Sequence, residues 1–256
     1  MTTPVAASPS AAESEQAPPE LGRGEATRRH IKQVARRLFA TRSLEAVSIR
    51  EIVKAAGQKN AGSIHYYFRS KDDLIRELIL DVARLRDAQH EERLNALEAG
   101  GEPLSIRAVV AILAEPPQIA TDDAGADDHA LRFLNMVMIN HRDLLFAAVQ
   151  GGADRGIRRC FDHLKRLLPE LPAPLVQQRL MLAMLYLFAV ASSREAAHEQ
   201  PDQWRYLWGH PAARDNLLDS IEGLLRQPPS PETLATLGTS PGGAPAPPKA
   251  RRSRSG

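Results

Sequence analysis

The sequence predicts an all-α fold, with an N-terminal helix-turn-helix domain of three helices followed by a helical-bundle domain. Only 5% of the 256 residues are aromatic, while 43% are hydrophobic and Ala and Leu are frequent. Runs of β-branched residues are scarce, and the apolar residues recur at helical spacing, so helix is favoured over strand throughout. The chain is long enough to bury a core of its own.

Four segments follow from composition. Residues 1–22 are rich in Ala, Pro, Ser and Glu and predict a disordered leader, and residues 227–256 predict a disordered, Pro-rich basic tail. Between them we expect two folded domains, over residues 23–80 and residues 81–226.

Several classes of protein are excluded by what the sequence lacks. The leader has no basic and apolar signal-peptide pattern, and no run approaches about 18 uninterrupted apolar residues, so we expect a cytoplasmic chain without a membrane span. The single cysteine, Cys160, allows no internal disulfide or thiol pair. We therefore expect no metal and no cofactor.

The first predicted helix is amphipathic and strongly basic. Its apolar stripe contains Ile31, Val34, Ala35, Leu38 and Phe39, at spacings of three and four residues. Arginines and a lysine occupy the other faces of this helix. This helix is the expected support for the two that follow.

The second and third predicted helices meet at a tight turn. Ser48 opens the second helix as an N-cap, with Glu51 placed to complete a capping box. Gly57 is suited to the left-handed position that closes a helix, and a short third helix is expected from Asn60 to Tyr67. Helix, turn and short helix is the arrangement that places a recognition helix in the major groove.

The fourth predicted helix starts at Ser70, where Asp73 completes a second capping box. Its apolar stripe runs through Leu74, Ile75, Leu78, Ile79, Val82 and Leu85. Because the stripe passes residue 80, we expect this helix to enter the second domain without a flexible linker.

The sequence of this region resembles the DNA-binding domain of the TetR/AcrR family of regulators. The likeness rests on VSIREIVKAAG at residues 47–57, SIHYYF at residues 63–68 and SKDDL at residues 70–74, and it covers about 55 residues. It implies a dimeric, ligand-responsive regulator, with a DNA-binding domain for double-stranded DNA over residues 23–80 and an effector-binding and dimerisation domain over residues 81–226. The family's usual mode is a repressor that a small molecule releases from a near-palindromic operator.

One departure leaves two registers open for the recognition helix. The segment between Gly57 and Phe68 is one residue longer than the family's commonest form. If the sequence is aligned backward from Phe68, then Ser63, His65 and Tyr66 face DNA and Tyr67 lies near phosphate. If it is aligned forward from Gly57, then Lys59 and Asn60 move toward the bases. Ser48 and Lys71 are the expected phosphate contacts, and Arg50 and Lys59 are expected at phosphate or, alternatively, at the bases. Packing within the small domain is the alternative role for His65, Tyr66 and Tyr67.

Charge supports a DNA-binding role for this region. Residues 23–71 contain 12 Lys or Arg against Glu25, Glu45 and Glu51, a balance of +9 in a chain whose net charge is +2. Such a concentration favours approach to a polyanion. Lys249, Arg251, Arg252 and Arg254 in the tail add either nonspecific attraction to phosphate or solubility.

The second domain contains five further helical patterns. They cover Ile106 to Leu113, Leu131 to Val149, Arg155 to Leu168, Leu175 to Ala197 and Ala212 to Leu225. An acidic loop is expected from Glu115 to Asp128. The last two helices are those through which the resemblance implies pairing of two subunits. The candidate interface residues are Leu175, Leu182, Leu185, Ala189, Leu217, Leu218, Ile221, Leu224 and Leu225, which are equally suited to the core of a single chain.

A ligand pocket is expected among soft and aromatic side chains of the same domain. The apolar candidates are Phe133, Met136, Met138, Phe146, Phe161, Met181 and Met184, with Asn140, His141 and Tyr186 as polar anchors. Ordinary core packing explains the same set. The expected effector is a small apolar or amphipathic molecule.

Two other functions remain open: an architectural DNA-binding protein without an effector, and a DNA-binding domain fused to an enzyme. A ligand-induced change in DNA affinity would separate the first from a regulator. The second lacks a catalytic motif in the sequence, because His141, Arg142 and Asp143 fit a helix-end charge cluster better than a catalytic site. We therefore expect no catalytic residues.

Overall fold

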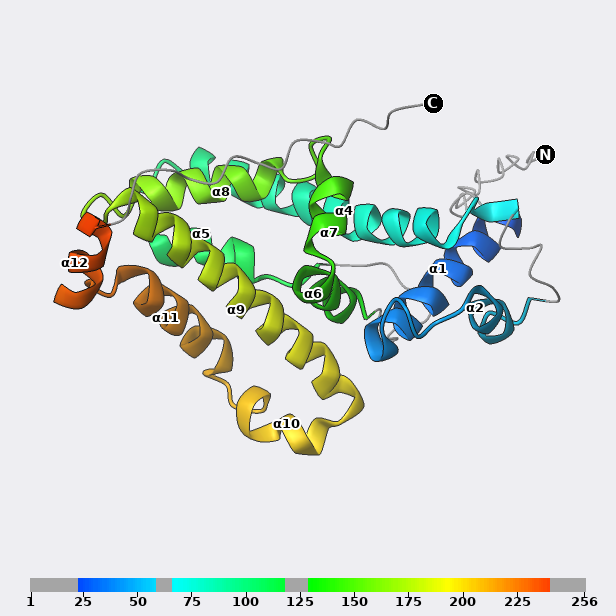
Figure 1. Ribbon diagram of the computed structural model, residues 1–256. Helices are drawn as coiled ribbons and strands as arrows, with labels where there is room; N and C mark the ends of the chain where they lie inside the picture. The colour runs from blue at the N-terminus through cyan, green and yellow to red at the C-terminus, as the bar shows by residue number, and fades with distance from the viewer. Residues whose placement is uncertain (1–22, 59–65, 118–128, 240–256) are drawn as a thin grey trace, which may run out of the picture. The chain divides into compact units, whose positions relative to one another are not determined.

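The computed structural model describes residues 23–58, 66–117 and 129–239, which form helices joined by turns (Figure 1). This agrees with the predicted all-α fold. The helices, labelled as in Figure 1, are α1 (Arg23–Arg42), α2 (Ile49–Ala55), α4 (Lys71–Ala99), α5 (Ile106–Ala114), α6 (Ala130–Asn140), α7 (Arg142–Val149), α8 (Arg155–Arg166), α9 (Ala173–Glu199), α10 (Pro201–Trp208), α11 (Ala213–Arg226) and α12 (Pro231–Thr239).

The chain divides into two compact units. The first contains α1, α2, α4 as far as Arg84, α6 and α7; the second contains α4 from Leu85, α5 and α8 to α12. Our sequence-based boundary near residue 80 placed α6 and α7 in the second domain, and the structure groups them with the first. The reason is packing, because α1 lies against both α6 and α2.

The core of the first unit is built on the predicted stripes. Ile31, Ala35 and Phe39 of α1 are fully buried, and the Phe39 ring lies 6.3 Å from the Phe133 ring of α6, centroid to centroid. The α4 stripe from Leu74 to Val82 is buried as well. The apolar faces predicted for the first and fourth helices are thus the faces that pack.

The predicted single helix from Leu131 to Val149 is wrong. His141 has φ −137° and ψ 43°, which is not helical, and it separates α6 from α7. Its carbonyl accepts from the Leu144 and Leu145 amides and so starts α7. The break also explains the charge cluster at residues 141–143, which lies at a helix start as expected. The His141 imidazole Nε2 lies 3.3 Å from Glu45 Oε1.

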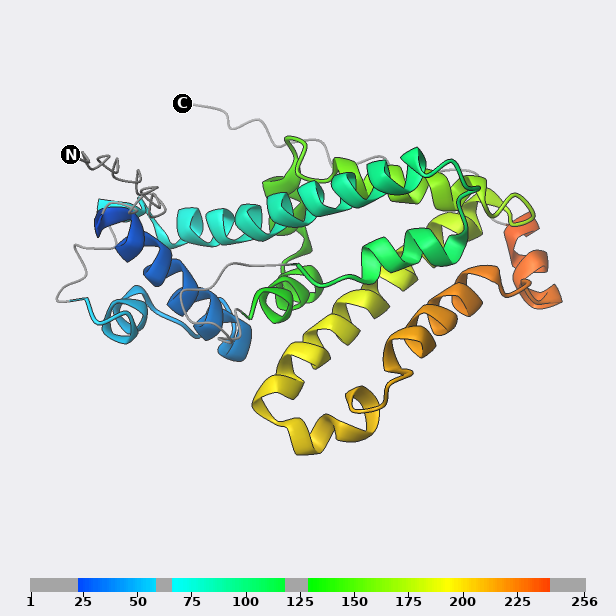
Figure 2. The same cartoon turned by 180° about the vertical axis from the view of Figure 1, so that it is seen from behind.

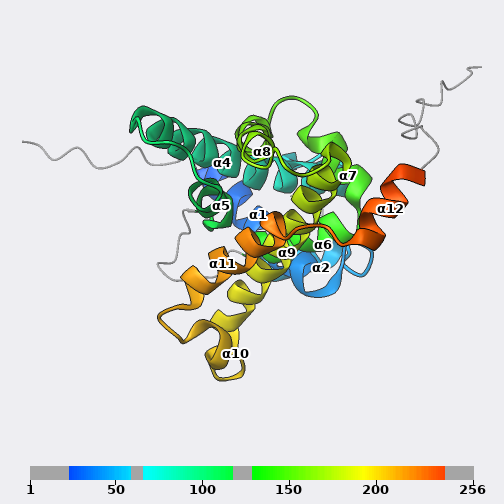
Figure 3. The same ribbon diagram turned by 90° about the vertical axis from the view of Figure 1, so that its left-hand side faces the viewer.

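In the second unit, α11 runs beside α9 in the views of Figures 1 and 2, and α5 packs against α8, α9 and α11 (Figure 3). Ion pairs and hydrogen bonds join these helices. Arg107 of α5 binds Asp215 and Asp219 of α11, and Arg179 of α9 donates to the Leu225 carbonyl at 2.9 Å. The second contact satisfies a carbonyl at the end of α11.

Two helices were not predicted from the sequence. Helix α10 begins with Pro201, and α12 lies in the tail that we expected to be disordered. That expectation is wrong for residues 231–239. Ser230 caps α12 by accepting from the Thr233 amide at 3.3 Å, and Pro231 occupies the first helical position, where a missing N–H costs nothing.

Among the described residues, α9 is long and apolar enough to cross a membrane, judged by length and composition alone. The core helix of a water-soluble protein has the same properties. Helix α9 packs against α5, α8, α10 and α11, and it buries Leu180, Met184, Leu187 and Phe188. This packing is that of a core helix.

Candidate nucleic-acid interface

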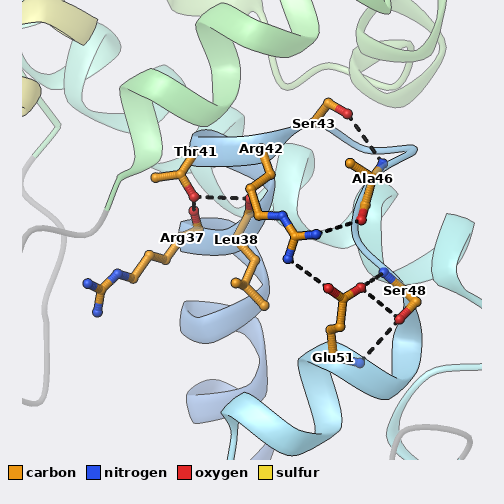
Figure 4. A network of polar contacts seen from close by, with 8 residues as sticks. All are labelled: Arg37, Leu38, Thr41, Arg42, Ser43, Ala46, Ser48 and Glu51. Carbon is orange, nitrogen blue, oxygen red and sulfur yellow. Dashed lines mark hydrogen bonds and ion pairs between the residues drawn. The ribbon is translucent and has the colours of Figure 1, made fainter.

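The start of α2 is held by the predicted capping box (Figure 4). The Ser48 hydroxyl accepts from the Glu51 amide at 3.3 Å, and Glu51 Oε2 accepts from both the Ser48 amide and the Ser48 hydroxyl at 2.8 Å. Since its hydroxyl is engaged in this box, Ser48 acts by positioning the helix. The prediction of a cap at Ser48 is confirmed.

Arg42, at the end of α1, joins that helix to the same cap. Its guanidinium donates to Glu51 Oε1 at 2.7 Å and to the Ala46 carbonyl at 3.1 Å (Figure 4). The hydrogen bonds from Ser48 and the contact with Arg42 lower the pKa of Glu51 to about 2. The carboxylate is therefore charged at neutral pH and connects the two helices.

The turn between α1 and α2 contains a residue with unusual backbone geometry. Ser43 has φ 138°, a region that residues other than glycine rarely adopt. Its hydroxyl oxygen accepts from the Ala46 amide at 3.3 Å, which stabilises the turn (Figure 4). The sequence did not indicate this feature.

The end of α2 is closed as predicted. Gly57 has φ +64°; its amide donates to the Lys54 carbonyl at 3.2 Å, and the Gln58 amide donates to the Val53 carbonyl at 3.0 Å. This pair of bonds is a Schellman motif. Helix α2 is thus fixed at both ends, with the exposed Arg50 in its first turn.

The basic residues of α1 fall into two groups. Arg28 and Lys32 bind Glu77 and Asp81 of α4, with 2.7 Å between Lys32 Nζ and Asp81 Oδ2, and so hold α1 to α4. Arg37 is exposed, and its side chain points away from the network around Arg42 (Figure 4). Exposed cations of this kind remain available for phosphate.

Tyr66 is the most exposed of the large hydrophobic side chains in the described part of the chain, at 82%. Its ring meets that of Tyr67 edge to face, with centroids 5.0 Å apart, and Tyr67 is half-buried. The structure therefore does not bury Tyr66 as a packing residue. Four other expected DNA contacts, Lys59, Asn60, Ser63 and His65, lie outside the described residues.

Two neighbours of the tyrosines have packing roles. Phe68 is 2% exposed and lies beneath the Arg28 guanidinium, 5.0 Å from the guanidinium carbon to the ring centroid. Lys71, expected at phosphate, donates to the Leu44 carbonyl, and its ammonium lies 5.8 Å from the Phe39 ring centroid. Lys71 thereby connects the start of α4 to the turn after α1.

The nine candidate interface residues separate by burial. Leu175, Leu218, Ile221 and Leu225 belong to the core of the second unit, each with 6% exposure or less. Leu182, at 54%, and Ala189 are exposed on α9, while Leu185, Leu217 and Leu224 are half-buried. Leu175, Leu218, Ile221 and Leu225 therefore have the alternative role, packing in the core of a single chain.

The candidate pocket residues are divided between the two units. The first unit contains Phe133, Met136, Met138, Asn140, His141 and Phe146, and the second contains Phe161, Met181, Met184 and Tyr186. Phe133 and Met184 are buried, whereas Tyr186 is 40% exposed and Phe146 is 41% exposed. The part of the chain that the structure describes holds no group of three His, Cys, Asp or Glu side chains that could bind a metal.

Sequence reasoning missed two sets of polar residues. Arg42 was counted only as charge, because its contact with Glu51 lies nine positions away across a turn. The second set is Arg86, His90 and Arg93 of α4, whose spacing of four and three residues places them on one face. Both sets lie on predicted helices, but their contacts with other helices are seen only in the structure.

Comparison with known proteins agrees with this geometry. Residues 31–78 match the family described as bacterial regulatory proteins, tetR family. The HTH-type transcriptional regulator AcrR of Shigella flexneri is 38% identical over 80 residues, which are 31% of this chain and 36% of that protein. The match thus spans about a third of the length of this relative.

Solved structures overlap more of the chain at lower identity. A transcriptional regulator from Rhodococcus sp. Rha1 is 19% identical, with a TM-score of 0.47, over 77% of this chain and 95% of that one. Superantigen PfiT is 15% identical, with a TM-score of 0.44, over 80% and 98%. These scores are low, so the assignment depends on the sequence matches, which lie over the helix-turn-helix region. Residues 31–78 of this chain are thus similar in sequence to the tetR family of bacterial regulatory proteins.

Proposed function

We propose that the chain is a sequence-specific DNA-binding regulator of transcription that acts as a homodimer and is released from its operator by a small effector. The observation that carries this proposal is the 82% exposed Tyr66, placed after a doubly capped α2 in a segment with a charge of +9. An exposed tyrosine next to a helix-turn-helix in a strongly basic segment is accessible to a nucleic acid. Base edges and thymine methyl groups are partners that fit a tyrosine.

The residues have separate roles in this proposal. Arg50 and Arg37 are exposed and contact phosphate, which sets the position of the protein on the duplex without reading its sequence. The network of Ser48, Glu51 and Arg42 fixes α2 against α1, so that α2 is presented to the duplex in one orientation. Tyr66 and the residues before it read the bases.

Two copies are needed for an operator of ordinary length. The exposed stripe of α9 contains Leu182, Tyr186 and Ala189, at spacings of four and three residues. A symmetric dimer through this stripe pairs the same surface on both subunits. The proposed dimer interface therefore consists of this stripe together with the half-buried Leu185, Leu217 and Leu224.

Selection of bound duplexes from a random library by the purified full chain tests the function. We expect a near-palindrome whose half-sites lie about 34–36 Å apart, or a multiple of one helical turn, as two symmetric recognition helices require. A set of bound sequences without any shared motif would contradict a sequence-specific regulator. It would favour an architectural DNA-binding protein.

A further inference from the structure

The second unit contains a group of basic side chains in a place where an apolar core is expected. Arg86, His90 and Arg93 lie on one face of α4, and His90 is only 4% exposed. Arg86 Nη2 donates to the Leu113 carbonyl of α5 at 3.3 Å, and its guanidinium carbon lies 5.9 Å from the Phe188 ring centroid of α9. The group thus lies among α4, α5 and α9.

The acids near this group do not balance its charge. Glu115 lies 3.7 Å from Arg93 and 3.8 Å from Arg214, so two arginines share one carboxylate. Glu195 is the acid that acts on Arg86. The Arg93 and Arg214 side chains are 28% and 61% exposed to water, so Arg86 is the buried cation of the group. The like charge of Arg93 acts on it more strongly than Glu195 does, and a buried charge is unfavourable unless an anion offsets it.

The electrostatics of His90 indicate the same imbalance of charge. Burial, together with the charges of Arg86 and Arg93, lowers the pKa of His90 to about 3, so the ring is neutral at pH 7. A neutral imidazole has one N–H donor and one acceptor nitrogen. Burial also lowers the pKa of Arg86 to about 10, yet this residue keeps part of its accessible surface.

The Phe188 ring beside Arg86 belongs to an apolar region of α9, and α5 has buried apolar residues as well. Phe188 and Met184 lie one turn apart on the buried face of α9, and Leu113 and Val109 are buried on α5. The guanidinium has five N–H donors, and its bond to Leu113 uses one of them. A fork of donors beside an aromatic ring suits a molecule with an anionic head and an apolar body.

We infer that Arg86 and His90 are the polar anchor of the effector site, and that the effector is an amphipathic carboxylate. Its carboxylate binds the Arg86 guanidinium, and its apolar part lies against Phe188 and Met184. This inference rests on the proposed function and narrows the effector from apolar or amphipathic molecules to anionic ones. It also replaces Asn140, His141 and Tyr186 as the expected polar anchors.

The test compares carboxylates with their neutral amides on the full chain at constant ionic strength. The probes are hexanoate, octanoate and 4-phenylbutanoate, each paired with its primary amide, and binding is measured by calorimetry and by the shift in Tm. We expect at least one carboxylate to bind about tenfold or more tightly than its amide, because only the carboxylate forms charge-assisted hydrogen bonds with the guanidinium. Arg86→Met should remove this preference.

Two further variants separate binding from a structural role of Arg86 at the end of α5. Arg86→Lys keeps the charge but loses the fork, so it should fold and retain a weakened preference for the carboxylate. Arg158→Met removes an exposed arginine that pairs with Asp154, and it should bind like the wild type. Equal binding of every carboxylate and its amide, or an unchanged preference in Arg86→Met, would overturn the inference.

DNA binding is measured on the same preparations so that the two proposals can fail separately. A chain that binds a carboxylate through Arg86 but binds no specific DNA would contradict the proposed function and leave the anion site standing. A chain that binds its operator and treats acids and amides alike would contradict the anion site alone.

Discussion

At the residue scale, the most informative group is the one that fixes the start of α2. The capping box of Ser48 and Glu51 follows from the sequence, because both residue types and their spacing are local. The contact from Arg42 to Glu51 spans nine positions and a turn with a positive φ at Ser43, so it needed the structure. Short-range chemistry is readable in a sequence, and contacts across a turn are not.

Glu51→Gln is expected to lower Tm at pH 7, because the amide cannot act as the acceptor for both Arg42 and Ser48. The folded pKa of Glu51, about 2, lies below its ordinary value of 4.5. A depressed pKa stabilises the fold above the ordinary pKa, and the contribution is lost as the pH falls through the folded value. The difference in Tm between wild type and Glu51→Gln should be constant above pH 4.5 and vanish near pH 2.

Asp72→Asn is the matched control for that measurement. Asp72 is an exposed acid in the first turn of α4, so its loss also removes a negative charge from a helix start. If Asp72→Asn and Glu51→Gln give the same dependence of Tm on pH, then a general charge effect is sufficient and the network around Ser48 has no special role.

At the scale of helices, apolar periodicity located most elements and misjudged where some of them stop. The stripes of α1 and α4 were predicted in large part, while Val34, Leu38 and Leu85 are only half-buried. The break at His141 was missed because residues 131–149 keep an apolar pattern through it, and only the backbone angles reveal the end of α6. The short helices α10 and α12 were missed because Pro-rich flanks are typical of loops as well as of helix starts.

Helix α8 crosses α4 at a glycine. A Cβ added to Gly156 would lie 2.7 Å from the Cβ of His90 and 2.8 Å from the Asp87 carbonyl oxygen, both on α4. Gly156→Ala should therefore destabilise the protein by about 1–3 kcal/mol, as overpacking does in other cores. Thermal or urea unfolding of the variant measures this change.

Gly223→Ala in α11 is expected to have the opposite effect on stability. No atom lies within 4 Å of a Cβ added there, so alanine should stabilise the helix by about 0.5–1 kcal/mol. Stabilisation by both substitutions would mean that the close approach of α8 to α4 does not constrain residue 156.

At the scale of the whole molecule, the sequence indicated the DNA-binding region, but its boundary at residue 80 differs from the observed division of the chain. The +9 charge and the helix-turn-helix spacing lie within one continuous segment. The grouping of α6 and α7 with α1 depends on contacts such as Phe39 with Phe133, between residues 94 positions apart. The anion-binding group of Arg86 and His90 was missed for the same reason, since its partners come from α5 and α9.

Assembly can be tested on the exposed stripe of α9. Leu182→Arg places a charge in the proposed interface, and we expect light scattering to change from twice 28.1 kDa to a single chain of that mass. Leu234→Arg is the control, because Leu234 on α12 is 47% exposed and lies outside the stripe. A Leu182→Arg protein that stays dimeric would place the interface elsewhere.

The central claim is that Tyr66 reads DNA, and two tyrosines of equal exposure test it most directly. Tyr66 is 82% exposed, and Tyr206 on α10 is 80% exposed. Fluorescence anisotropy with the selected operator should show Tyr66→Ala weakened by about 1–3 kcal/mol, as expected for a lost base contact, while Tyr206→Ala binds like the wild type. Operator affinity that is unchanged in a folded Tyr66→Ala protein would contradict the account.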